Sequence, residues 1–152
     1  NLVSEAIVSD IIPELSGYTS LRREVKYGEN SRIDILLQSK EKPDCYVEVK
    51  NVTMRRDNLR DSYAEFPDSI TSRGKKHLCE LSKMRRDGYR GVMLFLVQRN
   101  DIKTFGIASD IDPEYAEALS KAIDNGVEVF CYDCILSTMG ISVNQRLKVN
   151  LK

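Results

Sequence analysis

Residues 91–97 read GVMLFLV, an uninterrupted apolar run without a charge, and this run constrains the fold more than any other segment. A strand with one solvated face alternates apolar and polar residues, whereas a strand buried on both faces is apolar throughout. We therefore expect a sheet that is covered by helices. With 152 residues, the chain is long enough for one domain, residues 1–152, with a sizeable core around that sheet.

The other segments supply helices and strands for such a layered fold. The expected helices are residues 2–12, ended by Pro13; a segment capped by Thr71 or Ser72 and ended by Gly88; and a segment begun by Asp112-Pro113-Glu114 and ended by Gly126. The expected strands are residues 21–27, 32–37, 45–52, 91–97 and 127–132, with an edge strand in 141–151. This order predicts an α/β sandwich with an antiparallel hairpin inside a mixed central sheet.

Two polar stretches should interrupt the first strands. Residues 28–31 and 38–44 contain turn-forming residues and are expected to be turns. Residues 54–70 have many charges and no clear period, so we expect a long loop there. A loop of that length in a compact domain is more often functional than idle.

The charges of the chain balance, with 23 basic and 23 acidic residues, so it lacks the overall basic excess of a dedicated nucleic-acid binder. Two segments nevertheless differ in sign. Residues 71–90 carry seven basic and two acidic residues, whereas residues 101–133 carry eight acidic and two basic ones. A basic side of the molecule could therefore receive a phosphate backbone. A solvated helix with ordinary ion pairs explains the same charges equally well.

The composition also bears on the compartment. No apolar run approaches the roughly 20 residues of a membrane-spanning helix, and four cysteines are too sparse for a secreted disulfide scaffold. We therefore expect a cytoplasmic protein without a membrane partner. Cys131 and Cys134 form a single CxxC pair, which lacks the further ligands of a structural zinc site. Cys45 and Cys79 are expected to be buried.

Two carboxylates are expected to face each other across the hairpin. Strand side chains alternate between faces, so Asp34 and Glu48 lie opposite each other if paired positions sum to 82, and Arg32 then lies opposite Lys50. Opposed carboxylates repel, so a cation should sit between them. Hard oxygen ligands suit Mg²⁺ or Mn²⁺. The simpler alternative is a solvated ladder of ion pairs among these residues, which spacing alone favours.

Basic residues gather at the start of the second expected helix. Arg73, Lys75, Lys76 and His77 lie in its first turns, where free backbone N–H groups and the helix dipole favour an anion. A phosphate group is therefore expected there. His77 is the only histidine of the chain, and a structural hydrogen-bonding role is as well supported as a substrate contact.

The strand residues Asp34 and Glu48-Val49-Lys50 resemble the PD-(D/E)xK nuclease core. A wider set of segments is similar to the sugar fermentation stimulation protein (SfsA) family: SRIDILL, CYVEVKNVT, FPDSITSRGKKHLCEL, VQRND, DIDPEYAEAL and GVEVFCY, with ELSGYTSLRREVKYG before them. The resemblance implies a restriction-endonuclease-like core, DNA binding and a regulatory link to sugar use. It also implies an N-terminal OB-like domain that this chain lacks, which fits a chain beginning with Asn1 rather than Met.

The resemblance assigns roles to individual residues. It implies that Asp34 and Glu48 bind metal, that Lys50 assists hydrolysis, and that Glu5 or Glu24 supplies a further acid. The TxRGxKH stretch of the family matches residues 71–77. One departure is Ile33 in place of the proline that precedes the aspartate of the motif.

Two functions remain open at this stage. The first is a Mg²⁺- or Mn²⁺-dependent DNA phosphodiesterase in which Asp34, Glu48 and the Val49 carbonyl hold metal while Lys50 positions the attacking water. The second is a non-catalytic DNA-binding regulator of sugar-utilisation genes, which would use Arg73, Lys76, His77 and the basic helix. The sequence leaves the oligomeric state open, with a homodimer as one alternative.

Overall fold

The computed structural model describes residues 1–56 and 62–151. Its elements, in chain order, are α1 (Leu2–Val8), a 3₁₀ turn η1 (Pro13–Leu15), β1 (Ser20–Tyr27), β2 (Ser31–Ser39), β3 (Lys42–Val52), β4 (Met54–Arg55), β5 (Tyr63–Phe66), α2 (Ser72–Arg86), β6 (Arg90–Val97), β7 (Thr104–Ile107), α3 (Pro113–Asp124), β8 (Glu128–Ser137), β9 (Gly140–Arg146) and β10 (Lys148–Asn150).

The main sheet of the described residues has six strands in the order β1-β2-β3-β6-β8-β9. Strands β3, β6 and β8 are parallel to one another, and antiparallel hairpins flank them on both sides. A smaller sheet has the order β10-β7-β5-β4. The mixed α/β architecture and the antiparallel hairpin beside parallel strands confirm the expected fold class.

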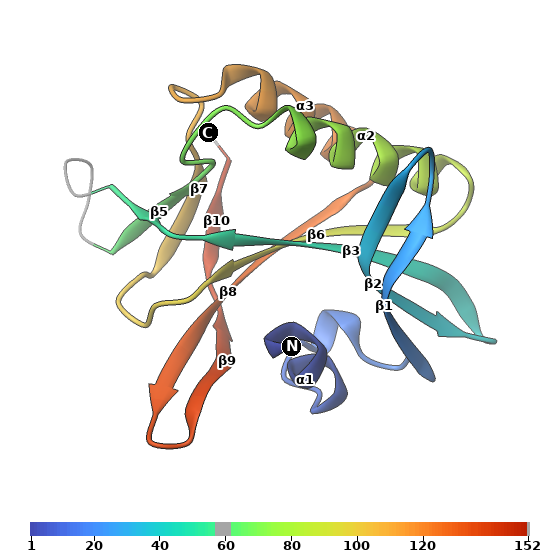
Figure 1. Ribbon diagram of the computed structural model, residues 1–152, viewed down its shortest axis with the longest axis horizontal. Coiled ribbons are helices and arrows are strands. Elements are labelled where there is room, and N and C mark those ends of the chain that lie inside the picture. Colours follow the sequence, from blue (N-terminus) through green and yellow to red (C-terminus); the bar gives the residue numbers. More distant parts are fainter. Residues whose placement is uncertain (57–61, 152) are drawn as a thin grey trace.

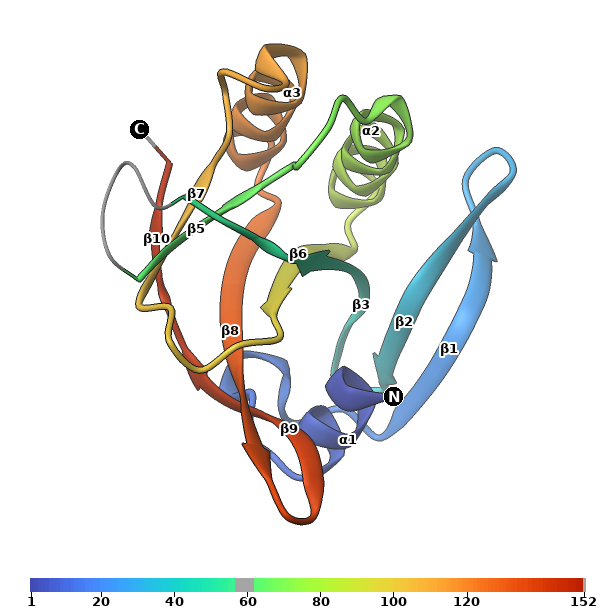
Figure 2. The same ribbon diagram turned by 60° about the vertical axis from the view of Figure 1, so that its left-hand side comes forward.

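Helices cover both faces of the main sheet, as Figures 1 and 2 show. Helices α2 and α3 lie side by side on one face, and α1 lies on the other. The side chains of β6 are divided between these two layers. Met93 and Phe95 belong to the core beneath α2 and α3, whereas Val92 and Leu94 pack towards α1. The apolar run 91–97 is therefore buried on both faces, as predicted.

The starts of α2 and α3 are joined by one buried carboxylate. Thr71 caps α2 by accepting from the N–H of Gly74, and Asp112 caps α3 by accepting from the N–H of Tyr115. The second oxygen of Asp112 accepts from the N–H of Thr71 at 2.8 Å. The pKa of Asp112 is lowered because these backbone donors outweigh the cost of its burial. The two helix starts are thereby fixed next to each other.

The first helix and the hairpin differ from their predicted bounds. Helix α1 ends at Val8, because Asp10 adopts a left-handed backbone with φ 57° and the N–H of Ile11 bonds to the carbonyl of Ala6. Strands β2 and β3 extend to Ser39 and Lys42, so the predicted turn over 38–44 is too long. Polar residues stay in the strands here because the Gln38 amide donates across the hairpin to Asp44.

The segment 54–70 differs most from its prediction. It contains strands β4 and β5, and β5 pairs in parallel with β7, another strand that the sequence did not predict. Part of the predicted loop lies at residues 57–61, outside the described residues. Cys45 is buried as predicted, whereas Cys79 is exposed, so that prediction was wrong. Cys131 and Cys134 are buried free thiols in β8.

Among the described residues, no helix is long and apolar enough to cross a membrane.

Candidate functional site

The two predicted carboxylates lie where β2 and β3 separate. The pairs Ile35–Val47 and Leu36–Tyr46 have the predicted register, in which paired positions sum to 82, but the predicted pairs Asp34–Glu48 and Arg32–Lys50 are not part of the ladder. The regular pairing stops there, and beyond it the carboxylate of Asp34 accepts from the backbone N–H of Val49 at 2.7 Å. A side chain thus holds the strands where the backbone ladder ends.

Glu48 is the most enclosed of the predicted acidic and basic site residues, with 3% of its surface exposed. Its Oε1 atom lies 3.0 Å from Lys50 Nζ and 2.9 Å from His77 Nδ1. Lys50 Nζ and His77 Nδ1 are themselves 2.9 Å apart. Three side chains, two from β3 and one from the inner face of α2, therefore form a closed triangle.

The surroundings of the two carboxylates move their pKa values in opposite directions. Burial alone would raise the pKa of Glu48, but the hydrogen bond from His77 and the charge of Lys50 lower it overall. The pKa of Asp34 is raised, mainly by burial and also by the negative charges of Glu48 and Glu24. The N–H of Val49 and the charge of Lys50 only partly offset this. Burial first, and the two acidic neighbours second, therefore make the charged form of Asp34 unfavourable.

One oxygen of Glu48 has no partner within the described residues. Glu48 Oε2 is buried and makes no hydrogen bond, and the buried hydroxyl groups of Tyr27 and Tyr115 are likewise unpartnered. Both tyrosines have raised pKa values, chiefly because of burial and then because of the charge of Glu48. An unpaired buried carboxylate oxygen is costly unless a donor or a cation reaches it.

A divalent cation fits this donor set. The described residues contain no group of three or more His, Cys, Asp or Glu side chains arranged to hold a metal. Two carboxylates and a backbone carbonyl are instead the sparse protein ligand set that Mg²⁺ accepts, with water and substrate phosphate completing the octahedron. The unpartnered Glu48 Oε2 is the feature of this donor set that favours such an ion.

The two further acids predicted for the site lie in different places. Glu24 lies in β1 between Arg23 and Val25, which pair with Ile35 and Ile33, so its register position is opposite Asp34. Its backbone is left-handed, with φ 55°. Glu5 is largely exposed, and its carboxylate lies 3.6 Å from the amino terminus of Asn1. The structure brings Glu24 close to Asp34 and shows no contact between Glu5 and the described carboxylates.

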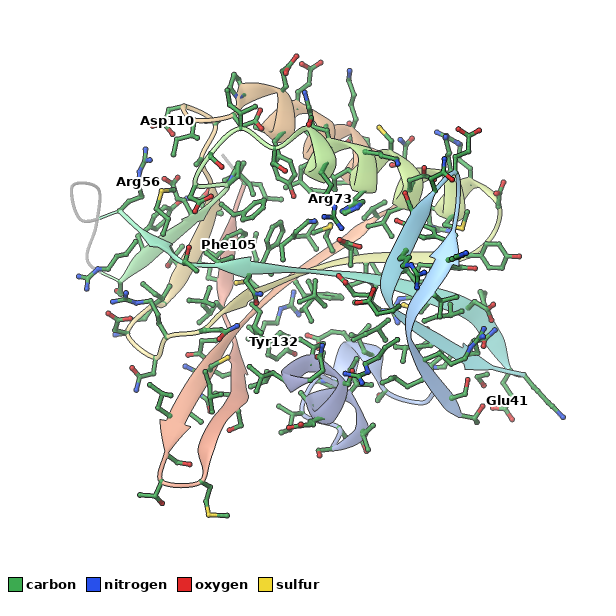
Figure 3. The ribbon with its side chains drawn as sticks, viewed as in Figure 1. Glu41, Arg56, Arg73, Phe105, Asp110 and Tyr132 are labelled. Carbon is green, nitrogen blue, oxygen red and sulfur yellow. The ribbon has the colours of Figure 1, made fainter. Side chains whose placement is uncertain are left out.

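The residues predicted to bind phosphate are not equivalent. Arg73 and Lys76 are exposed on the first turns of α2, and Figure 3 shows Arg73 extending from α2 in the direction of β3. Lys75 is paired with Glu114 of α3 at 2.7 Å. Arg32 is exposed and donates to the backbone carbonyl of Glu24 at 3.4 Å. His77 is buried against Glu48, which does not fit its predicted contact with phosphate.

The sequence analysis did not single out three buried residues that carry unpartnered polar atoms, Tyr27, Tyr115 and Glu80. Tyr115 lies in the apolar repeat of a predicted helix and Tyr27 ends a predicted strand, so neither residue stood out as part of a site. Glu80 is buried with an unpartnered oxygen, and a Cβ on Gly28 would lie 2.0 Å from it. The sequence indicated Glu80 only through its position three residues after His77, which places both side chains on one face of α2.

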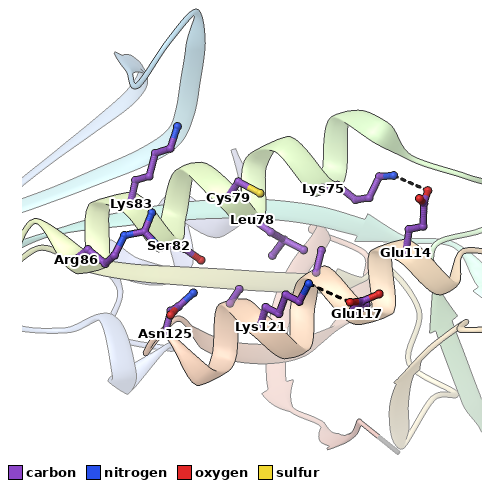
Figure 4. Close-up of a pocket in the computed structure, with 12 residues that line it drawn as sticks. Lys75, Leu78, Cys79, Ser82, Lys83, Arg86, Glu114, Glu117, Lys121 and Asn125 are labelled. Atoms are coloured by element: carbon purple, nitrogen blue, oxygen red, sulfur yellow. Dashed lines mark hydrogen bonds and ion pairs between the residues drawn. The ribbon is translucent and has the colours of Figure 1, made fainter.

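A groove of about 470 Å³ between α2 and α3 lies apart from this site (Figure 4). The pairs Lys75–Glu114 and Lys121–Glu117 lie along it. At the start of β6, Arg90 forms an ion pair with Glu128 of β8. The basic and acidic segments of the sequence are therefore neighbours that partly neutralise each other, and not two opposite sides of the molecule.

Comparison with known proteins identifies relatives. Residues 1–140 match the family described as "Sugar fermentation stimulation protein RE domain". The sugar fermentation stimulation protein homolog of Rhodospirillum centenum is 52% identical over 149 residues, covering 98% of this chain and 63% of that protein. The homolog of Shewanella loihica is 50% identical over 151 residues, covering 99% of this chain and 63% of that protein.

A solved structure is also similar. The structure of Pyrococcus furiosus SfsA in complex with Ca²⁺ superposes with a TM-score of 0.85 at 30% identity, covering 97% of this chain and 62% of that chain. The present chain thus spans about 63% of the length of the curated relatives that it matches.

Proposed function

The chain belongs to the sugar fermentation stimulation protein family, and we propose that it has a restriction-endonuclease-like core that hydrolyses DNA phosphodiester bonds with a divalent metal. One observation carries this proposal: Glu48 is buried with Oε1 held by Lys50 and His77, while Oε2 has no partner in the described residues. The protein therefore supplies partners to Oε1 and leaves Oε2 without a donor or a cation.

Asp34, Glu48 and the Val49 carbonyl are the groups that would hold Mg²⁺ or Mn²⁺. The ion would act as a Lewis acid on a phosphate oxygen and lower the pKa of a bound water. A cation beside Asp34 would favour the ionised form of this carboxyl, whose pKa is raised mainly by burial in the metal-free protein. A relative has been solved in complex with Ca²⁺, which like Mg²⁺ is a hard cation that prefers oxygen ligands.

Lys50 would act on the attacking water and on the phosphate. Its ammonium group contacts both Glu48 and His77, and the Lys50 side chain is 17% exposed, so it can reach a substrate from a fixed position. A fixed positive charge beside the scissile phosphate stabilises the negative charge that develops during displacement. Lys50 would also orient the water by donating an N–H hydrogen bond to the water oxygen.

The first turns of α2 would contact the DNA backbone. Arg73 and Lys76 are exposed, and neither makes an ion pair within the described residues. Free N–H groups at a helix start add to the attraction for phosphate. Lys75, next to them in sequence, is engaged by Glu114 and contributes less.

DNA cleavage by a Lys50→Met variant tests the catalytic proposal. Nicking of single- and double-stranded DNA in Mg²⁺ or Mn²⁺ should fall by roughly 10²- to 10⁴-fold, the usual effect of losing a residue that assists proton transfer. Lys40→Met is the matched control, because Lys40 is exposed in the turn between β2 and β3 and should leave cleavage unchanged. Equal activity of Lys50→Met and the wild type would contradict the assignment.

The alternative is a DNA-binding regulator without cleavage. The exposed Arg73 and Lys76 favour it, because they can bind phosphate whether or not the carboxylates hold a metal. Binding of DNA without metal-dependent nicking, measured with the same samples, would support this function. In either case the buried free thiols of Cys45, Cys131 and Cys134 fit a reducing compartment, so we place the protein in the cytoplasm.

A further inference from the structure

We propose that His77 is a positioning residue whose Nδ1 atom exchanges partners, donating to Glu48 when the site lacks a cation and accepting from Lys50 when a cation binds Glu48. This inference rests on the proposed metal site. It concerns a residue that the sequence assigned to phosphate binding and that the structure buries, with 6% of its surface exposed.

The geometry allows only one of the two contacts to be a hydrogen bond at a time. His77 Nδ1 lies 2.9 Å from Glu48 Oε1 and 2.9 Å from Lys50 Nζ. In a neutral imidazole, Nδ1 carries either a proton or a lone pair. A carboxylate only accepts and an ammonium group only donates. The same atom therefore serves Glu48 in one tautomer and Lys50 in the other.

Whether a cation is bound to Glu48 determines which tautomer of His77 is favoured. Without a cation, Oε1 is the only oxygen of Glu48 that has partners in the described residues, and donation from His77 and Lys50 offsets part of the cost of its burial. A cation on this carboxylate would supply that compensation itself. It would also repel the ammonium group of Lys50, which then needs another acceptor.

His77 Nδ1 is the acceptor in reach. His77 lies on the inner face of α2, and its Nδ1 atom touches both partners, so no ring movement is needed. Only the imidazole proton changes place, leaving Nδ1 and being replaced from solvent at Nε2, with no change in charge. Lys50 would thereby keep one orientation as the metal binds, which is the condition for a pre-organised site.

The imidazole nitrogens of this chain offer a direct test, because His77 is its only histidine. The protein labelled with ¹⁵N-histidine gives one imidazole in long-range ¹H–¹⁵N spectra, recorded at a pH of about 8, where an ordinary histidine is neutral. We expect the Nδ1–H tautomer without metal and the Nε2–H tautomer at saturating Mg²⁺. The same tautomer in both states would overturn the proposal.

The Asp34→Asn variant is the control for the metal. It should not bind Mg²⁺ and should keep the Nδ1–H tautomer at every concentration. Calorimetry on the same samples separates the two proposals. Mg²⁺ binding by the wild type with an unchanged tautomer overturns only the role of His77, whereas the absence of any binding overturns the metal site and this role together.

Two substitutions distinguish positioning from simple packing. His77→Asn keeps a short side chain with a donor and an acceptor, whereas His77→Leu fills the space without either. We expect kcat to fall by about 10- to 100-fold in His77→Leu, as is typical when a residue that orients a site is lost. His77→Asn should recover most of this loss, and KM for DNA should not change in either variant. Equal losses in both would show that His77 acts through packing alone.

Discussion

Two ion clusters on the same sheet contrast in how completely they are satisfied. Arg90 of β6 and Glu128 of β8 form a bidentate pair, with contacts of 2.5 and 2.9 Å that use both carboxylate oxygens, and the third arginine nitrogen donates to the hydroxyl of Tyr18. Glu48 has both of its contacts, Lys50 and His77, on one oxygen. Its second oxygen has no partner within the described residues.

The difference separates a structural cluster from a candidate functional one. Every donor and acceptor of a structural pair can be satisfied inside the protein, because nothing else has to bind there. A site that receives a ligand must leave some groups unsatisfied, and it is less stable for that reason. We therefore interpret the incomplete coordination of Glu48 as the mark of a binding site.

The largest expected difference between the clusters is in catalysis. Glu48→Gln keeps the size of the side chain but removes its charge. Loss of a residue that only supports a metal ligand typically costs about 10- to 100-fold. Because Glu48 is proposed to bind the metal directly, metal-dependent DNA cleavage should fall by more than that. Glu128→Gln should leave the rate of the folded protein within about twofold. Rates with saturating DNA and Mg²⁺ measure both, and equal losses in the two variants would remove the distinction.

The reverse contrast is expected in stability. Arg90→Met breaks the saturated pair and leaves Glu128 without its partner, so the free energy of unfolding should fall by about 1 to 2 kcal/mol. DNA cleavage per folded molecule should be unchanged. Urea denaturation gives the stability, and a loss of cleavage at a concentration where the variant is fully folded would show that this cluster is also functional.

The same contrast applies to the cations of α2. Arg73 and Lys76 make no ion pair within the described residues, whereas Lys75 is bound to Glu114. The double change Arg73→Ala and Lys76→Ala should reduce the slope of log affinity against log salt by roughly 1.8, for two lost phosphate contacts. Lys75→Ala should change it less. A slope unaffected by the double change would place the DNA elsewhere.

The smallest expected effect is a gain in stability. The raised pKa of Asp34 means that the folded state binds its proton more tightly than the unfolded state, so stability falls as pH rises from the ordinary pKa, about 3.9, through the raised one. Above that range the penalty is fully present. Asp34→Asn should therefore stabilise the metal-free protein near neutral pH by up to about 1 kcal/mol. Thermal unfolding at pH 4 and pH 7 checks this, with the gain confined to the higher pH.

Much of the fold could be predicted because strong local patterns determine it. The run 91–97 predicted a strand buried on both faces, Asp112 and Gly126 marked the ends of α3, and the hairpin register followed from the alternation around Asp34 and Glu48. Strands β4, β5 and β7 have two to four residues each, which is too short for a period to emerge. Their pairing depends on contacts between distant segments.

The site was only partly visible in the sequence for a similar reason. Alternation along two strands was enough to place Asp34, Glu48 and Lys50 together. It could not show that His77 turns inwards while Arg73 and Lys76, on the same turns of α2, stay exposed. That division depends on how α2 is rotated on the sheet. The unpartnered oxygen of Glu48 depends on atomic positions and has no sequence pattern.

A calorimetric titration with Mg²⁺ or Mn²⁺ tests the central claim most directly. The wild type should bind the cation, Glu48→Gln and Asp34→Asn should lose that binding, and Glu128→Gln should bind like the wild type. The same affinity in all four proteins would show that Glu48 of β3 and Asp34 of β2 do not form a metal site.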